Sequence, residues 1–192
     1  MMRPILLLWS CMDRIIVIGL AGAGKTTLAK RLSELLDVPH TELDSVFYKE
    51  NWEPVETGVF KSKVDEIAKA DRWILCGNYF SKLGLYLWRQ ADTIIWCDYS
   101  FPRVMMRLFR RTVRRMAARE ELWSGNRESF YTNFLTKDSI FVWSFKSRKK
   151  QSQRYGSLFS NPGELPGVRL IRLKTPKAAE SFLNGLKHEQ QS

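Results

Sequence analysis

The stretch Gly19-Leu20-Ala21-Gly22-Ala23-Gly24-Lys25-Thr26 decides the fold class of this 192-residue chain. It matches the pattern G-x-x-x-x-G-K-[ST], whose glycines let successive backbone N–H groups face phosphate oxygens. A β-branched apolar run at residues 14–18 precedes the stretch, and Lys25–Leu36, with leucines at helical spacing, follows it. A strand, a glycine-rich loop and a helix in this order form a phosphate-binding loop (P-loop, or Walker A motif), so we predict a nucleoside-triphosphate site here.

Residues of this loop have separate expected roles in binding ATP or a related nucleoside triphosphate. Lys25 is expected to reach the β- and γ-phosphate oxygens and to serve catalysis, and the Thr26 hydroxyl is expected to ligate Mg²⁺, the implied cofactor. The residues expected to contact the nucleotide are Gly19, Gly22, Ala23, Gly24, Lys25, Thr26 and Thr27.

The rest of the chain alternates apolar strands with amphipathic helices. Further strands are predicted at residues 41–43, 73–76, 93–97 and 168–173, and further helices at 60–70, 101–119 and 176–187. This alternation predicts an α/β fold, a parallel sheet with helices on both faces, in a single domain spanning residues 1–192. The long insertion at about residues 101–154 lies between the fourth and fifth strands, and residues 1–13 form an extension of unassigned role.

Composition points to a reducing compartment. The three cysteines, Cys11, Cys76 and Cys97, are widely spaced and have no partners at metal-binding spacing, which favours the cytoplasm and argues against a zinc site. The apolar run at residues 4–9 is too short for a signal peptide or a membrane span, so no membrane association is predicted.

Polar residues follow several of the predicted strands, at the edge where ligands collect in parallel sheets. Asp44 follows residues 41–43 and is expected to orient or deprotonate an acceptor hydroxyl. Asp98 follows residues 93–97, where it is either an Mg²⁺ ligand or a helix cap. Residues expected to bind an acceptor are Asp44, Trp52, Asn78 and Tyr79, although Gly77-Asn78 is equally typical of a structural turn.

The net charge of +11 is concentrated in the insertion, where residues 103–119 hold seven arginines and residues 146–154 form a second basic run. On a helical period Arg103, Arg107, Arg110 and Arg114 share one face, and Met105, Phe109, Val113 and Met116 share another. Unpaired arginines repel one another unless an anion compensates them, so phosphates are the expected partners. A solvated basic face and nucleic-acid binding are the alternatives.

With these features placed, the chain resembles the adenylate-kinase-like branch of P-loop proteins. It is more closely similar to a bacterial family labelled "DNA topology modulation protein" or AAA-family ATPase. The matching stretches are residues 43–44, 51–55, 71–73, 77–79 and 121–128, and the likeness runs from Arg14 to the C-terminal helix.

The resemblance implies a three-layer fold, with a five-stranded sheet of order 2-3-1-4-5 and an arginine-rich lid between strands four and five. It also implies that Arg107 and Arg111 are lid arginines that contact the base and the phosphates, and it makes Arg127, in the family's own motif, a candidate catalytic residue.

One segment departs from the monophosphate kinases, which carry Asp-Gly-x-Pro-Arg after the third strand. Here the segment is Cys76-Gly77-Asn78-Tyr79-Phe80, so the arginine that grips an acceptor phosphate is absent. This disfavours a nucleoside monophosphate acceptor and shifts the magnesium role toward Asp44 or Asp98. We therefore expect a Mg²⁺-dependent phosphotransferase with an unidentified small-molecule acceptor. A nucleic-acid-associated ATPase and a nucleotide-binding regulator with little turnover are the alternatives.

Overall fold

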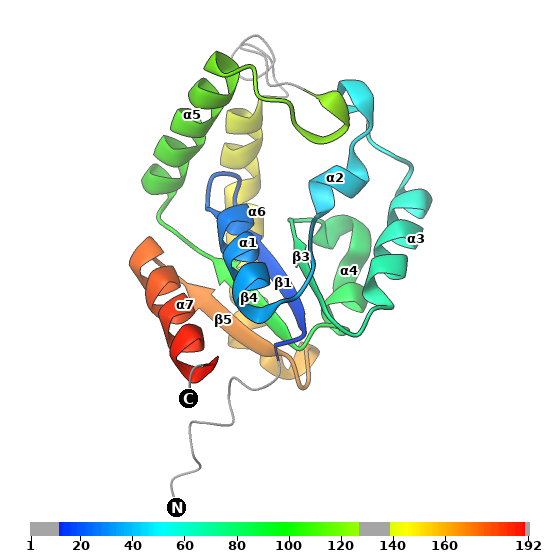
Figure 1. Cartoon of the computed structure of the whole chain (residues 1–192), viewed down its shortest axis with the longest axis vertical. Helices are drawn as coiled ribbons and strands as arrows, with labels where there is room; N and C mark the ends of the chain where they lie inside the picture. Colours follow the sequence, from blue (N-terminus) through cyan, green and yellow to red (C-terminus); the bar gives the residue numbers. More distant parts are fainter. Residues whose placement is uncertain (1–11, 127–138, 191–192) are drawn as a thin grey trace, which may run out of the picture.

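A computed structural model of the chain describes residues 12–126 and 139–190. Its centre is a five-stranded parallel sheet of order β2-β3-β1-β4-β5, which confirms the expected 2-3-1-4-5 arrangement (Figure 1). The strands are β1 (Arg14–Gly19), β2 (His40–Glu42), β3 (Trp73–Cys76), β4 (Thr93–Cys97) and β5 (Arg169–Leu173).

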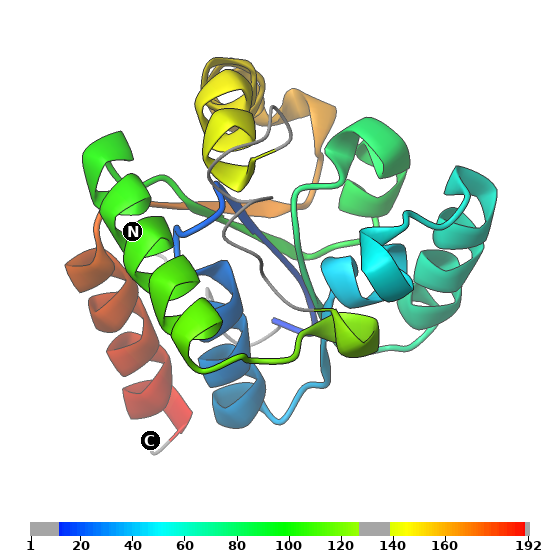
Figure 2. The same ribbon diagram turned by 90° about the horizontal axis from the view of Figure 1, so that it is seen from above.

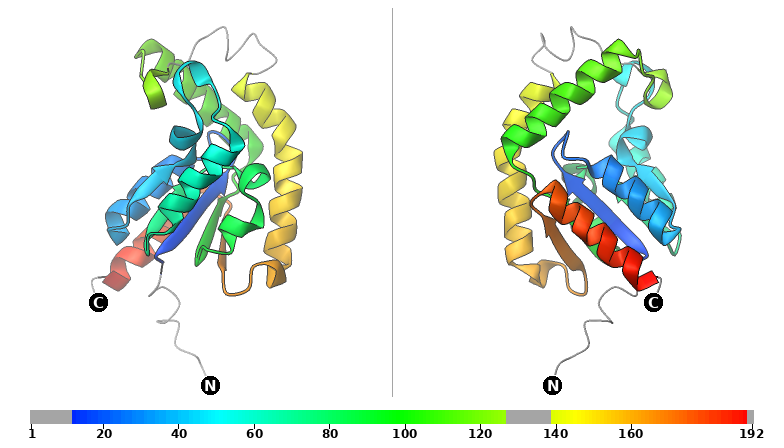
Figure 3. Two further views of the ribbon diagram at one scale, coloured as in Figure 1. Left: turned by 90° about the vertical axis from the view of Figure 1, so that its right-hand side faces the viewer. Right: turned by 60° about the vertical axis from the view of Figure 1, so that its left-hand side comes forward.

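Helices cover both faces of this sheet, as predicted, to give three layers (Figures 2 and 3). The described residues form α1 (Lys25–Leu36), α2 (Leu43–Phe47), α3 (Thr57–Ala68), α4 (Phe80–Trp88), α5 (Phe101–Ala117), α6 (Ile140–Ser160) and α7 (Pro176–Gln190). Helices α1 and α7 pack on one face, whereas α3, α4 and α6 pack on the other. Short 3₁₀ turns lie at Glu50–Trp52, Trp123–Gly125 and Pro162–Glu164.

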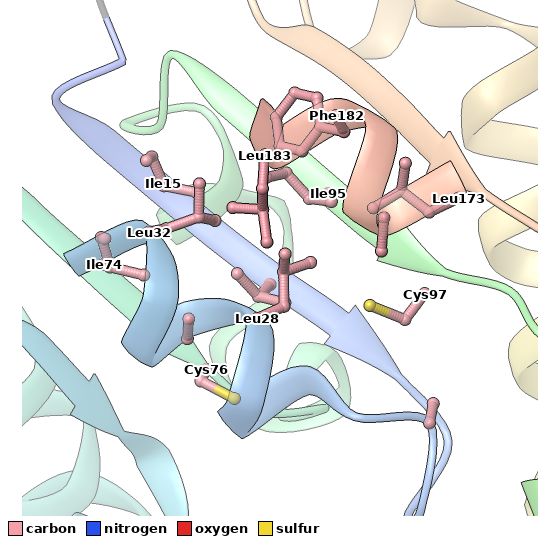
Figure 4. Packing of buried hydrophobic residues seen from close by; sticks show 14 of the residues in the cluster. Ile15, Leu28, Leu32, Ile74, Cys76, Ile95, Cys97, Leu173, Phe182 and Leu183 are labelled. Carbon is pink, nitrogen blue, oxygen red and sulfur yellow. The ribbon is translucent and has the colours of Figure 1, made fainter. Parts of the chain in front are cut away.

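The central strand β1 explains why both faces need cover. Its side chains alternate, so Ile15 and Val17 join the apolar cluster under α1 and α7, shown in Figure 4, while Ile16 and Ile18 join the cluster under the opposite helices. All four side chains are at most 1% exposed. The P-loop follows the carboxyl end of β1 and is therefore attached to a strand that is buried on both faces.

Two boundaries differ from the sequence prediction in ways that matter for the site. Strand β2 ends at Glu42, so Asp44 lies in the first turn of α2 and not directly after a strand. The insertion after β4 contains a second long helix, α6, in addition to the predicted arginine helix, α5.

Among the described residues, no helix has both the length and the apolar character required to cross a membrane.

Candidate active site

The P-loop is a tight turn whose glycines are required by its geometry. Gly22 and Gly24 have φ values of +83° and +87°, a region that L side chains rarely adopt, and the N–H of Ala23 donates to the carbonyl of Leu20 at 3.0 Å. Gly24 is the N-cap residue of α1 and has no side chain to cap the helix. The first N–H groups of α1 therefore face the loop, which is the arrangement that binds phosphate.

Lys25 and Thr26 lie at the start of α1, as predicted, and their polar atoms have defined partners. The Lys25 Nζ donates to the Leu20 carbonyl at 3.1 Å, which holds the ammonium group inside the loop. The Thr26 hydroxyl donates to Oε2 of Glu42 at 3.0 Å. Glu42 is the last residue of β2, and the sequence analysis missed it because the strand was expected to continue to residue 43.

A buried thiol shows how closely these groups converge. Burial raises the pKa of Cys76 to about 12, and the charges of Lys25, Glu42 and Asp44 all act on the same thiol, the first lowering its pKa and the carboxylates raising it. The Thr26 hydroxyl oxygen lies 4.0 Å from the Cys76 sulfur. The start of α1 and the ends of β2 and β3 thus bring together the Thr26 hydroxyl, the Glu42 carboxylate and the Cys76 thiol.

Asp44 is held by a tyrosine of the loop after β3. The Tyr79 hydroxyl donates to Oδ1 of Asp44 at 2.6 Å, and the Tyr79 ring packs at 4.9 Å from both Phe47 and Phe60. Burial, and then the Asp44 charge, raise the pKa of Tyr79, so its phenol stays protonated and donates at neutral pH. Asp44 and Tyr79, both predicted to bind an acceptor, are therefore brought together.

Asn78 serves the phosphate loop through its side-chain amide. Its Oδ1 accepts from the N–H of Gly19 at 3.0 Å, and its Nδ2 donates to the Gly19 carbonyl and, at 3.3 Å, to Gln151 of α6. The turn after β3 therefore makes two contacts. Asn78 binds the backbone of Gly19 at the start of the P-loop, and Tyr79 binds the carboxylate of Asp44. This geometry favours a positioning role for Asn78, whose amide is engaged by backbone.

Trp52, the remaining residue predicted to bind an acceptor, lies in the turn after α2 and contacts the segment that follows α5. Its N–H donates to Oδ1 of Asn126 at 2.8 Å, and its ring meets Tyr48 and Trp123 edge to face at 5.5 and 6.3 Å. Asn126 is buried and also donates to the carbonyls of Lys49 and Trp123, both at 2.7 Å. Arg127, the next residue, lies outside the described residues.

Helix α5 packs directly on the P-loop. A Cβ atom at Gly22 would lie 2.7 Å from the Val104 carbonyl oxygen and 2.9 Å from the Leu108 Cβ, so only glycine fits beneath the helix. The Arg107 guanidinium lies 3.1 Å from the Cβ position of Gly24 and over the Tyr99 ring. The predicted lid residue Arg107 is therefore placed at the phosphate loop, and Arg111 is half-buried one turn further along.

The buried face of α5 is Val104, Leu108 and Thr112, because this row meets Gly22. It is not the expected apolar row, in which Phe109 and Val113 remain 49% and 41% exposed.

Asp98 has a different partner from the one expected. Arg172 donates to its Oδ2 through Nε at 2.8 Å and also through Nη2, while the same guanidinium lies over the Trp96 ring. Strands β4 and β5 place Arg172 beside Trp96 in register, two residues before Asp98. The carboxylate beside Thr26 is that of Glu42, not that of Asp98.

Comparisons with known proteins agree with this fold. A family model described as an AAA domain matches residues 15–98, from β1 to the end of β4. The structure of shikimate kinase from Bacteroides thetaiotaomicron superimposes with a TM-score of 0.57 at 14% identity, covering 95% of this chain and 100% of that one. This chain has the P-loop kinase fold.

Two further shikimate kinases of the same fold are similar to this chain. The Acinetobacter baumannii enzyme in complex with shikimate gives a TM-score of 0.53 at 13% identity, with 94% of each chain covered. The Aquifex aeolicus enzyme gives 0.51 at 14%, covering 93% of this chain and 99% of that one. No curated protein sequence matches the chain. The matches support a kinase-like P-loop protein, and the narrower likeness to the DNA topology modulation family stays a prediction.

Within the P-loop kinase fold, the site has two unlike sides. Helix α5, with Arg107, stands on one side of the start of α1, and helix α2, with Asp44, stands on the other (Figures 1 and 2). A cationic side and a carboxylate side therefore flank the position where the P-loop would hold a terminal phosphate.

Proposed function

We propose that the protein is a Mg²⁺-dependent phosphotransferase that moves the γ-phosphoryl group of ATP to a hydroxyl group of a small molecule. The observation that carries this proposal is the placement of Asp44, fixed by Tyr79, across the P-loop from Arg107. A protein that only bound nucleotide would need the P-loop but not a positioned carboxylate facing it.

On the donor side, positive groups surround the phosphates. The α1 N-terminus and Lys25 would hold the β- and γ-phosphates, and Arg107 would stabilise charge on the phosphoryl oxygens during transfer. The Thr26 hydroxyl and the Glu42 carboxylate, 3.0 Å apart, are the hard oxygen donors that fit Mg²⁺. When bound, Mg²⁺ supplies charge neutralisation of the phosphate oxygens. In this proposal Glu42 takes the place first considered for Asp98, because Arg172 engages Asp98.

On the acceptor side, Asp44 would accept the proton of the attacking hydroxyl group. Tyr79 engages only Oδ1 of that carboxylate and keeps it in one orientation, so the second oxygen can face an acceptor. Trp52 would line the same side. Similar structures belong to shikimate kinases, one of them in complex with shikimate, which supports a small hydroxylated acceptor here. The missing acceptor-side arginine after β3 argues against a nucleoside monophosphate.

The test is a product assay with γ-labelled ATP, Mg²⁺ and a panel of polyols, sugars, nucleosides and hydroxy acids that includes shikimate. We expect a labelled product with at least one compound, lost in Lys25→Ala and in Asp44→Asn. Asp44→Asn should retain ATP affinity, because its side chain lies on the acceptor side. Labelled inorganic phosphate alone, at equal rates in wild type and Asp44→Asn, would instead establish an ATPase, and the absence of any turnover would indicate a regulator.

A further inference from the structure

The segment that follows α5 crosses to the turns that follow α2. In Figures 1 and 2 residues 118–126 run from the end of α5 to the 3₁₀ turn at Glu50–Trp52. Helix α5 carries Arg107, and helix α2 carries Asp44. We call residues 48–52 and 118–126 the α2–α5 bridge, because they join the cationic side of the site to its carboxylate side.

The side chain of Asn126 is the centre of this bridge. Its Oδ1 accepts from the Trp52 N–H at 2.8 Å, and its Nδ2 donates to the carbonyls of Lys49 and Trp123, both at 2.7 Å. Asn126 is only 4% exposed. A buried amide that uses both of its protons holds its partners in one geometry, because an unpaired buried donor is unfavourable.

A second set of bonds connects the bridge to Asp44. The Ser124 hydroxyl donates to the Tyr48 carbonyl at 3.1 Å, and the Tyr48 N–H donates to the Asp44 carbonyl at 3.0 Å. The bridge is therefore bonded to the backbone of α2 at Asp44, whereas Tyr79 binds the Asp44 side chain.

The α5 part of the bridge lies outside the hydrophobic core. Among the described residues 118–126, none belongs to either apolar cluster of the sheet, and Asn126 alone is buried. The rings of Trp52 and Trp123 add an edge-to-face contact at 6.3 Å. Loss of the Asn126 bonds should therefore leave the core intact and release the two sides of the site from each other.

The backbone of the bridge adopts conformations that favour glycine. The φ angles are +57°, +59°, +48° and +57° at Asn51, Trp52, Arg119 and Ser124. These are four of the five non-glycine residues with positive φ in the described part of the chain. Such conformations persist only where surrounding contacts enforce them, and they concentrate at active sites, ligand clamps and switch segments. The strain thus favours a functional role for the bridge.

We propose that Asn126 is a positioning residue that sets the distance between Asp44 and Arg107 and couples nucleotide binding at α5 to α2. The inference rests on the proposed function, whose two sides it joins. Helix α5 packs on Gly22 independently of the bridge, so Arg107 should stay at the phosphates without it. Helix α2 has only five residues, and the bridge keeps its Asp44 in line with the γ-phosphate. Loss of Asn126 should therefore impair transfer and not ATP binding.

The first measurement separates kcat from ATP affinity, with the acceptor identified in the product assay. The test variant is Asn126→Asp, which keeps the shape of the side chain but cannot donate to the two carbonyls. We expect kcat to fall about a hundredfold, with the Kd for ATP changed by less than about threefold. Ser124→Ala should lower kcat about fivefold, because a single bond to Tyr48 is lost.

Two controls accompany these variants. Asn184→Asp makes the same chemical change at an exposed position of α7 and should alter neither constant. Leu186→Ala removes a buried side chain of the same helix, so it lowers stability without touching the bridge. Its kcat should stay close to that of the wild type at a temperature at which the protein is folded.

A second measurement requires no phosphoryl transfer. Hydrogen–deuterium exchange of residues 48–53 is compared with and without Mg²⁺ and a non-hydrolysable ATP analogue. In the wild type the analogue should slow this exchange at least about threefold, because it restrains α5 and the Trp52 N–H is bonded to Asn126. In Asn126→Asp the analogue should still slow exchange in the P-loop but leave residues 48–53 unchanged.

These results also separate the proposal from the kinase proposal. If the wild type labels no acceptor, the kinase proposal fails, and the exchange measurement alone decides the role of Asn126. The role is overturned by an unchanged kcat in Asn126→Asp, or by equal losses of kcat and ATP affinity. It is also overturned by a fall in kcat that Leu186→Ala reproduces, or by an analogue effect on residues 48–53 that is absent in the wild type or persists in Asn126→Asp.

Discussion

Replacing Gly22 by alanine tests whether α5 rests on the phosphate loop. The residue has φ +83°, and forcing an L side chain into the left-handed region costs about 1–2 kcal/mol. The new Cβ would lie 2.7 Å from the Val104 carbonyl oxygen, about 0.7 Å closer than the 3.4 Å at which ordinary contact begins. Relieving that overlap adds about 1–3 kcal/mol. We therefore expect Gly22→Ala to lower the free energy of unfolding by about 3 kcal/mol.

The same substitution should weaken nucleotide binding, because Arg107 moves with α5. Its guanidinium lies beside Gly24, so a shift of several tenths of an ångström misaligns it with the phosphates. We expect at least about a tenfold loss of affinity for a fluorescent ATP analogue, measured together with urea unfolding. The control is Gly156→Ala in α6, where a Cβ meets nothing within 4 Å and helix propensity should add up to about 1 kcal/mol.

If Gly22→Ala matched Gly156→Ala in both stability and affinity, α5 would not pack on the P-loop. The assignment of Arg107 to the phosphates would then fail with it.

Three further outcomes are expected. Glu42→Gln should raise the Mg²⁺ concentration for half-maximal transfer by about tenfold, measured by titrating the metal at fixed ATP, because the carboxylate beside Thr26 is lost. Tyr79→Phe should reduce transfer by about a hundredfold, with ATP affinity unchanged, since Asp44 loses its orienting bond. Urea unfolding should show stability falling above pH 9, because the unfolded thiols ionise from there while burial holds the pKa of Cys76 at about 12 and that of Cys97 at about 11. By pH 10 the loss is about 1.4 kcal/mol per thiol, and below about pH 8 it vanishes.

Each of these results has a clear opposite. An unchanged metal requirement in Glu42→Gln would remove that residue from the magnesium site. Equal losses of ATP affinity and transfer in Tyr79→Phe would indicate general damage to the fold. A stability that stays flat to pH 11 would mean that Cys76 and Cys97 are not buried as described.

Local pattern was sufficient to predict the P-loop and the presence of a parallel sheet. The motif of residues 19–26 combines a strand, a loop and a helix within a short stretch, and the order of the strands follows from the kinase-like resemblance. Arg107, which the family resemblance implies as a lid residue, lies beside Gly24 of the loop, and the helical pattern alone did not show which face of α5 meets the loop.

Contacts between segments that are far apart in the sequence could not be predicted from local pattern. The pairing of Asp98 with Arg172, 74 residues later in the chain, depends on β5 lying beside β4. The sequence prediction ended the second strand at residue 43, whereas β2 ends at Glu42. This one-residue difference places the Glu42 side chain beside Thr26, and the sequence analysis therefore missed it. The buried row of α5 depends on Gly22 lying beneath it, which the helical pattern alone does not contain.

The central claim is that the γ-phosphoryl group leaves ATP for a small molecule and that Asp44 serves that step. The most direct measurement follows label from γ-labelled ATP into product for wild type and Asp44→Asn at saturating ATP and Mg²⁺. We predict a labelled small-molecule product that falls at least about a hundredfold in Asp44→Asn, with ATP affinity preserved. Equal labelled product from both proteins, or label found only in inorganic phosphate, would contradict the account.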